Sequence, residues 1–111
     1  MRVIMMEVLK PAEVKEIDGS LDGMQAIVGG SIELYCPFKE HVGIIVNEEG
    51  KILGLPENRM VSDNGKIIDI LCGPAFIVNL DSEDGNFADI TDEQIRLLMP
   101  RIGGLVIRCQ K

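Results

Sequence analysis

Most of this chain is a succession of short β-compatible apolar segments separated by turn residues, and that pattern constrains the fold more than any other feature. The opening segment MRVIMMEVLK is expected to be a strand that pairs with a short edge strand at VKEID. In SIELYC, apolar and polar residues alternate, which is typical of a half-buried strand. Further strands are expected at PAFIVNL and LVIRCQ. The pattern predicts a β-rich chain.

Two stretches carry turn residues that are typical of hairpins. NEEG, at residues 47–50, lies between HVGIIV and KILGL, and its glycine supplies the positive φ that such loops require. Asn64-Gly65, a strong two-residue hairpin signal, lies between RMV and KIIDIL. We therefore expect a hairpin at each of these two places.

One short helix is expected at residues 20–29. Ser20 is a candidate N-cap, the apolar residues after it recur at helical spacing, and Gly29 and Gly30 are typical of a helix end. Phosphate-binding loops place their glycines before a helix, whereas this pair comes after one. The glycines therefore indicate a stop and not a phosphate site.

A second helix is expected at ITDEQIRLLM. Thr91 and Gln94 have the spacing of a capping box, in which each side chain bonds the other residue's backbone N–H. Pro100 lacks a backbone donor and is expected to end or kink this helix.

The length of 111 residues is typical of a single domain, and we assign residues 1–111 to one domain. Hydrophobic residues make up 46% of the chain but aromatic residues only 4%, so the interior is expected to be aliphatic. We predict an α+β fold with a mostly antiparallel sheet of about five to seven strands and two short helices covering one face.

Charge and hydropathy exclude several classes of protein. The chain has 11 basic and 18 acidic residues, a net charge of −7, which opposes direct nucleic-acid binding. An acidic mimic of DNA stays open as a minor alternative. No stretch approaches the roughly 18 apolar residues that span a bilayer, and the opening segment lacks a signal-peptide cleavage site. We expect a cytoplasmic protein without membrane contact.

Few residues are suited to catalysis or metal binding. The three cysteines are widely spaced, which indicates reduced thiols in strands and neither a disulfide framework nor a zinc site. His41 is the only histidine, so cysteine–histidine catalysis would require it to lie beside one particular thiol. The acidic loop DSEDGN fails the spacing of a calcium loop. We predict no metal, no cofactor and no catalytic residue, with an enzyme as the less favoured alternative.

The segment GLPENR, at residues 54–59, is the one candidate binding site. Pro56 is expected to end the strand that starts at Lys51, which would place Asn58 and Arg59 in a loop. In the structural interpretation, Arg59 pairs with a nearby carboxylate or with a carbonyl at a strand end. In the functional interpretation, Pro56, Asn58 and Arg59 bind a small nucleotide-like anion with help from backbone donors. Both interpretations stay open.

Several motifs in order give the chain a family resemblance. EIDGSL, QAIVGGSIELY, NEEGKILGLPENR, IIDILCGPAFIV and ITDEQI together resemble the domain of unknown function 3846, over roughly residues 2–99. The tail PRIGGLVIRCQK is less similar. The resemblance implies a small cytoplasmic product of gut bacteria, their phages or conjugative elements, and it carries over no catalytic residue.

The leading functional hypothesis is a noncatalytic binding or interaction domain, an accessory protein of a phage or mobile element that meets a host or defence protein. The alternative is a small-ligand binding protein that uses the 54–59 loop.

Overall fold

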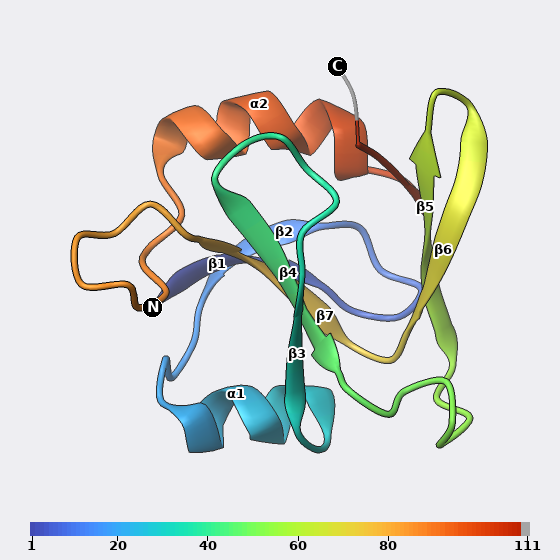
Figure 1. Cartoon of the computed structure of the whole chain (residues 1–111), viewed down its shortest axis with the longest axis horizontal. Helices are drawn as coiled ribbons and strands as arrows, with labels where there is room; N and C mark the ends of the chain where they lie inside the picture. Colours follow the sequence, from blue (N-terminus) through green and yellow to red (C-terminus); the bar gives the residue numbers. More distant parts are fainter. Residues whose placement is uncertain (110–111) are drawn as a thin grey trace.

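The computed structural model describes residues 1–109, which form an α+β fold of eight strands and two helices (Figure 1). The strands are β1 Arg2–Met6, β2 Glu13–Glu16, β3 Ile32–Tyr35, β4 Val42–Asn47, β5 Glu57–Asp63, β6 Lys66–Cys72, β7 Ala75–Asn79 and β8 Val106–Arg108, and the helices are α1 Leu21–Val28 and α2 Asp92–Ile102. A large antiparallel sheet has the order β2-β1-β7-β4-β3, and a small sheet has the order β6-β5-β8. The predicted fold class is confirmed.

The two helices cover opposite faces of the large sheet (Figure 1). Met24 of α1 packs in one core cluster with Val3 and Phe76, whereas Leu98 of α2 packs in the other with Ile4. The prediction that both helices cover one face is therefore wrong. The reason is that β1, β4 and β7 carry consecutive buried apolar residues, so both faces of the sheet must be shielded from water.

Two predicted hairpins are present. β1 pairs with β2, and β5 pairs with β6 across the Asn64-Gly65 turn. Asn64 has a φ of 53° and Gly65 a φ of 78°, the two positive values that a tight type I′ turn requires.

The prediction of a hairpin at residues 41–55 is wrong. β4 pairs with β3 and β7, and residues 48–54 form consecutive turns. Within this segment the N–H of Leu53 donates to the carbonyl of Glu49, and the N–H of Leu55 donates to the carbonyl of Gly50. These local bonds use main-chain groups that a strand would offer to a neighbour.

The helix ends agree with their sequence signals, with one exception. The Ser20 side chain caps α1, Gly29 ends it in the left-handed conformation, and Thr91 and Gln94 form the expected capping box. Helix α2 contains Pro100 and continues to Ile102, so the proline does not stop it. A proline this close to a helix end removes one backbone bond without disturbing a further turn.

The small sheet completes the core. β8 runs parallel to β5 and places buried Ile107 beside Val61, in the cluster that also contains Ile4 and Leu98. The predicted terminal strand is confirmed at residues 106–108, while Gln110 of that prediction lies outside the described residues. No helix within residues 1–109 is long and apolar enough to span a membrane.

Candidate functional site

Asn58 and Arg59 lie inside strand β5, not in a loop. Pro56 immediately precedes the strand, where its missing N–H removes no sheet bond, and its carbonyl accepts from the N–H of Gly73 at 2.7 Å. Both side chains are buried, since Asn58 is 5% exposed and Arg59 is 1% exposed, and the strand register shifts between Glu57 and Arg59. The expected loop at 54–59 is therefore corrected, because strand β5 begins at Glu57, directly after Pro56.

The Arg59 guanidinium bonds to neutral oxygens. It donates to the Oδ1 of Asn58 at 2.7 Å, to the carbonyl of Glu7 at 3.4 Å and to the carbonyl of Lys10. Burial lowers the pKa of Arg59. Within residues 1–109 no carboxylate forms an ion pair with this cation. This geometry favours the structural interpretation, in which Arg59 binds carbonyls, over an anion site.

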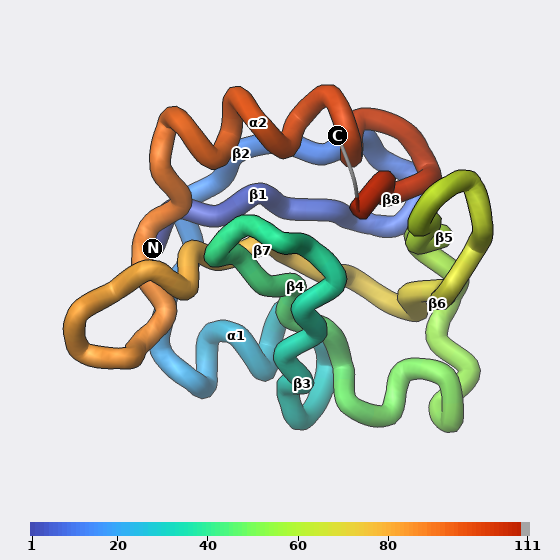
Figure 2. Tube along the Cα trace, turned by 45° about the horizontal axis from the view of Figure 1, so that its top comes forward, coloured from blue at the N-terminus to red at the C-terminus, as the bar shows by residue number. Residues whose placement is uncertain are grey.

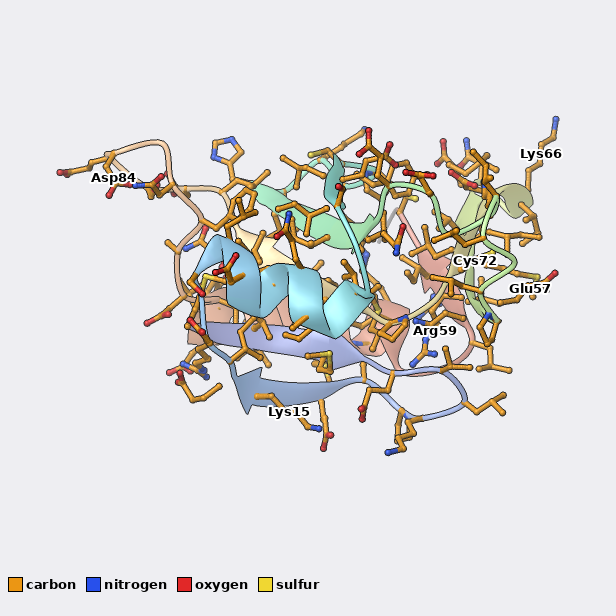
Figure 3. The ribbon with its side chains drawn as sticks, turned by 90° about the horizontal axis from the view of Figure 1, so that it is seen from below. Lys15, Glu57, Arg59, Lys66, Cys72 and Asp84 are labelled. Atoms are coloured by element: carbon orange, nitrogen blue, oxygen red, sulfur yellow. The ribbon has the colours of Figure 1, made fainter. Side chains whose placement is uncertain are left out.

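Asn58 joins the two sheets. Its Nδ2 donates to the carbonyl of Met6, at the end of β1, and to the carbonyl of Gly73, before β7, each at 2.8 Å. Figure 3 shows Arg59 beside the chain that leaves β1. Together the two side chains fasten β5 of the small sheet to the large sheet.

The same arginine holds the turn between β1 and β2, which we call the Leu9 turn, residues 7–10. The N–H of Lys10 donates to the carbonyl of Glu7 at 3.1 Å, and Arg59 binds the carbonyls of both residues. At the tip, Leu9 has a φ of 61° and is 83% exposed. The left-handed region costs a leucine about 1–2 kcal/mol, so the fold keeps a large apolar side chain in solvent and in a strained backbone.

Exposed apolar side chains gather at the end of the molecule that carries the small sheet. We call this surface the apolar end, and its members are Leu9, Ile52, Leu53, Met60, Ile67, Ile68 and Leu105. The segments that carry them, namely the β1–β2 turn, the β4–β5 link, the β5–β6 hairpin and the link into β8, lie at one end in both views (Figures 1 and 2). Exposed apolar side chains that gather at one end of a molecule are candidates for a contact site.

Two ion pairs lie beside the apolar end. Lys51 Nζ lies 2.6 Å from the Oδ1 of Asp69, and Lys10 Nζ lies 3.5 Å from the Oε2 of Glu7. Although burial raises the pKa of Asp69, the hydrogen bonds from Lys51 and from the N–H of Ile70 outweigh it and hold that pKa below its usual value. The bond to Asp69 raises the pKa of Lys51. Each pair is neutral, whereas Glu48, Glu49 and Glu57 are exposed on the same segments and form no ion pair with another described residue.

A cleft of about 250 Å³ separates β3 from β6 next to this pair. Tyr35, Lys51, Asp69 and Cys72 are among the residues that line it. Burial, with a smaller contribution from Asp69, raises the pKa of Tyr35, so its phenol stays neutral near pH 7. The cleft lining includes no histidine that would activate Cys72 as a nucleophile.

Comparison with family models gave a match to the Domain of unknown function (DUF3846) over residues 1–103. The chain belongs to the DUF3846 family. Searches of curated proteins and of solved structures returned no match. The family match agrees with the resemblance seen in the ordered motifs of the sequence.

The potentially reactive residues of this DUF3846 chain are dispersed. His41 is exposed just before β4, Cys36 is exposed just after β3, and Cys109 is buried after β8. Of the three free cysteines only Cys72 lies within a strand, so the expectation of three strand thiols holds for one of them. The described residues contain no group of three or more histidine, cysteine or acidic side chains placed to hold a metal ion.

Sequence reasoning identified none of the apolar end of this DUF3846 domain. One signal was present in KIIDIL, where Ile67 and Ile68 are consecutive apolar residues. Because side chains alternate across a strand, two neighbours of this kind cannot both face one core. The sequence around Leu9 did not indicate that its side chain is exposed. That exposure depends on a turn whose Lys10 carbonyl is bound by Arg59, 49 residues away in sequence.

Proposed function

We propose that this chain is a noncatalytic protein-interaction domain that binds a partner protein through its apolar end. One observation carries the proposal. Among the described residues ten large apolar side chains are exposed, and seven of them belong to the apolar end. Leaving so many in water at one place is unfavourable for an isolated domain, and a partner that covers them would remove that cost.

The chemistry of the surface favours a protein over other ligands. Exposed Glu48, Glu49 and Glu57 lie on the segments of the apolar end and outside the ion pairs of the described chain, so the surface there is acidic and repels a polyanion. A net charge of −7 for the whole chain opposes nucleic acid. Arg59, the cation considered for a nucleotide-like anion, faces the interior.

The family resemblance suggests where the partner is found. We place the domain in the cytoplasm as an accessory protein of a phage or mobile element, and its partner among host or defence proteins. The partner's contact surface is expected to be apolar at its centre with a polar rim, as is typical of specific interfaces.

Recovery of a partner from a lysate of the cells that carry the gene tests this function. The comparison is between Ile68→Lys in the apolar end and Leu34→Lys in β3, two strand positions with similar exposure, 53% and 43%. Lysine is tolerated on exposed edge strands, so both variants are expected to fold, as circular dichroism checks.

We expect the wild-type chain and Leu34→Lys to recover the same protein in stoichiometric amount, and Ile68→Lys to recover at least about tenfold less, because a buried unpaired charge opposes the contact. Equal recovery by both variants, or no stoichiometric partner for the wild-type chain, would show that the apolar end is not the binding surface.

A further inference from the structure

We propose that the link between β4 and β5 is a strap that shields the edge of β6 and keeps two copies of this chain from pairing through that edge. The strap comprises residues 48–54. Strand β6 is an outer strand of the small sheet, so within the described sheet one of its sides has no neighbouring strand. This inference goes beyond the proposed partner contact and does not rest on it.

The first step is how the strap meets β6. The Nζ of Lys51 lies 2.6 Å from the Oδ1 of Asp69, the middle residue of the strand. Gly50 lies so close to the carbonyl of Cys72 that a Cβ added to it would be 2.7 Å from that oxygen, so a residue without a side chain is needed there. The strap therefore stands beside the half of β6 that runs from Asp69 to Cys72.

The second step is the main-chain donor of Ile70 in this edge strand. Its N–H donates to the Oδ1 of Asp69 at 2.8 Å, and the same oxygen accepts from Lys51. One carboxylate thus satisfies a main-chain donor and anchors the strap. Beyond the shielded half, three residues of β6 remain for an incoming strand, fewer than the roughly five or six of a usual strand.

The third step is the chemistry of the strand that would pair with an unshielded edge. In β6, KIIDILC, apolar residues flank Asp69 symmetrically, with Ile68 and Ile70 next to it and Ile67 and Leu71 beyond. Two copies that pair antiparallel about a two-fold axis at Asp69 would place each Ile68 opposite Ile70 of the other copy, on the same face. Such apolar cross-strand pairs stabilise a sheet, so the edge is complementary to itself.

The same residue opposes this pairing in the wild-type chain. In the symmetric arrangement the two Asp69 carboxylates would face each other, and like charges directly opposite destabilise a pair of strands. The net charge of −7 adds a general repulsion between copies. The wild-type chain is therefore expected to be monomeric, and the shielding depends on Asp69.

Asp69→Thr tests the shielding, because it removes the anchor of the strap, the bond to the Ile70 N–H and the central charge, while threonine favours strand conformation. Asp92→Thr is the matched control, since it removes the same charge and an ion pair of the same length, 2.6 Å to Arg2, but lies in α2. Circular dichroism checks that both variants fold. If Asp69→Thr does not fold, Asp69→Asn takes its place, because it keeps the size of the side chain and loses its charge.

Sedimentation equilibrium of the full chain measures association in about 0.15 M salt, where the Debye length is about 8 Å. We expect Asp69→Thr to form a dimer with a dissociation constant at least about tenfold below the values for the wild-type chain and for Asp92→Thr. Equal association of the three proteins would overturn the inference.

Hydrogen exchange of Asp69→Thr then locates the contact. The amide of Ile70 should exchange at least about tenfold more slowly in the dimer than in the diluted monomer, because it donates to the second strand in the dimer. A dimer in which exchange at Ile70 stays unchanged would show that another surface associates, and the proposed role of the strap would be wrong.

Discussion

Arg59 is a buried cation whose partners within the described chain are neutral oxygens. Such a charge is tolerable only when carbonyl dipoles replace the water it has lost. Its carbonyl partners Glu7 and Lys10 lie 52 and 49 residues away in sequence. The helix-capping roles of Ser20 and Thr91 were predictable because their partners are three residues away. The burial of Arg59 was not predictable from the sequence, because local residue spacing carries no information about carbonyls about 50 residues away.

Arg59→Lys is expected to destabilise the fold by about 1–3 kcal/mol, because one ammonium group cannot reach the carbonyls of both Glu7 and Lys10 and leaves a buried acceptor unpaired. Urea unfolding measures the change. Arg96→Lys is the matched control, since the bonds of Arg96 within residues 1–109 are to Glu93 at the surface, and stability should stay nearly unchanged. Equal midpoints for the two variants would contradict the role of Arg59.

Asp69→Asn is expected to lower stability by about 0.2–1 kcal/mol near neutral pH by removing the charge paired with Lys51. The pKa of Asp69 is below its usual 3.8 in the folded chain, so the ionised group stabilises the fold above that pH and loses this effect as the pH falls through the lowered pKa. Thermal melts of both proteins should differ at pH 6 and converge in strong acid. A gap that stays constant on acidification would exclude the ion pair as the cause.

At the scale of elements, the β5–β6 hairpin was predicted from Asn64-Gly65 and is present, whereas the hairpin around NEEG was not formed. Both turn sequences contain a glycine, so turn residues alone do not determine whether a hairpin forms. The difference lies in the segment after each turn, because KIIDIL supplies seven residues of strand with Cys72, while KILGL is short and meets Pro56. Which strands become neighbours depends on the whole apolar pattern and not on one turn.

Gly65→Ala is expected to destabilise the hairpin by about 1–2 kcal/mol, because its φ is 78° and alanine is strained there. Gly104→Ala is the control: an added Cβ meets open space at both positions, but Gly104 has no positive φ. Chemical denaturation compares the two, and equal stabilities would show that the backbone conformation at Gly65 is not what matters.

At the scale of the whole molecule, the two sheets share one core, since Val61, Leu71 and Ile107 of the small sheet pack with Ile4 and Ile44 of the large one. The α+β class was predictable from the sequence because the periods of strand and helix are local. The division into two sheets was not, because it depends on β8 reaching β5 from far along the chain. The apolar end was missed for the same reason, since four separate segments compose it.

A shared core predicts that residues 1–109 unfold as one cooperative unit. Ile107→Val in the small sheet and Ile45→Val on the α1 side of the large sheet should each cost about 0.5–1.5 kcal/mol. In calorimetry both variants should shift a single transition whose calorimetric and van't Hoff enthalpies agree. Two separated transitions, each sensitive to one variant only, would show that the sheets unfold independently.

Of the eight described strands, β8 is the last in sequence, so it joins the small sheet after β5 and β6 have been synthesised. Until β8 has been synthesised, the edge of β5 that pairs with it stays unpaired, and Val61 lacks its neighbour Ile107. A nascent chain that stalls before residue 106 would expose the unpaired backbone N–H and C=O groups of β5. Open strand edges of this kind are prone to aggregation. Pairing with β8 thus closes an edge of β5 that the earlier part of the described chain leaves open.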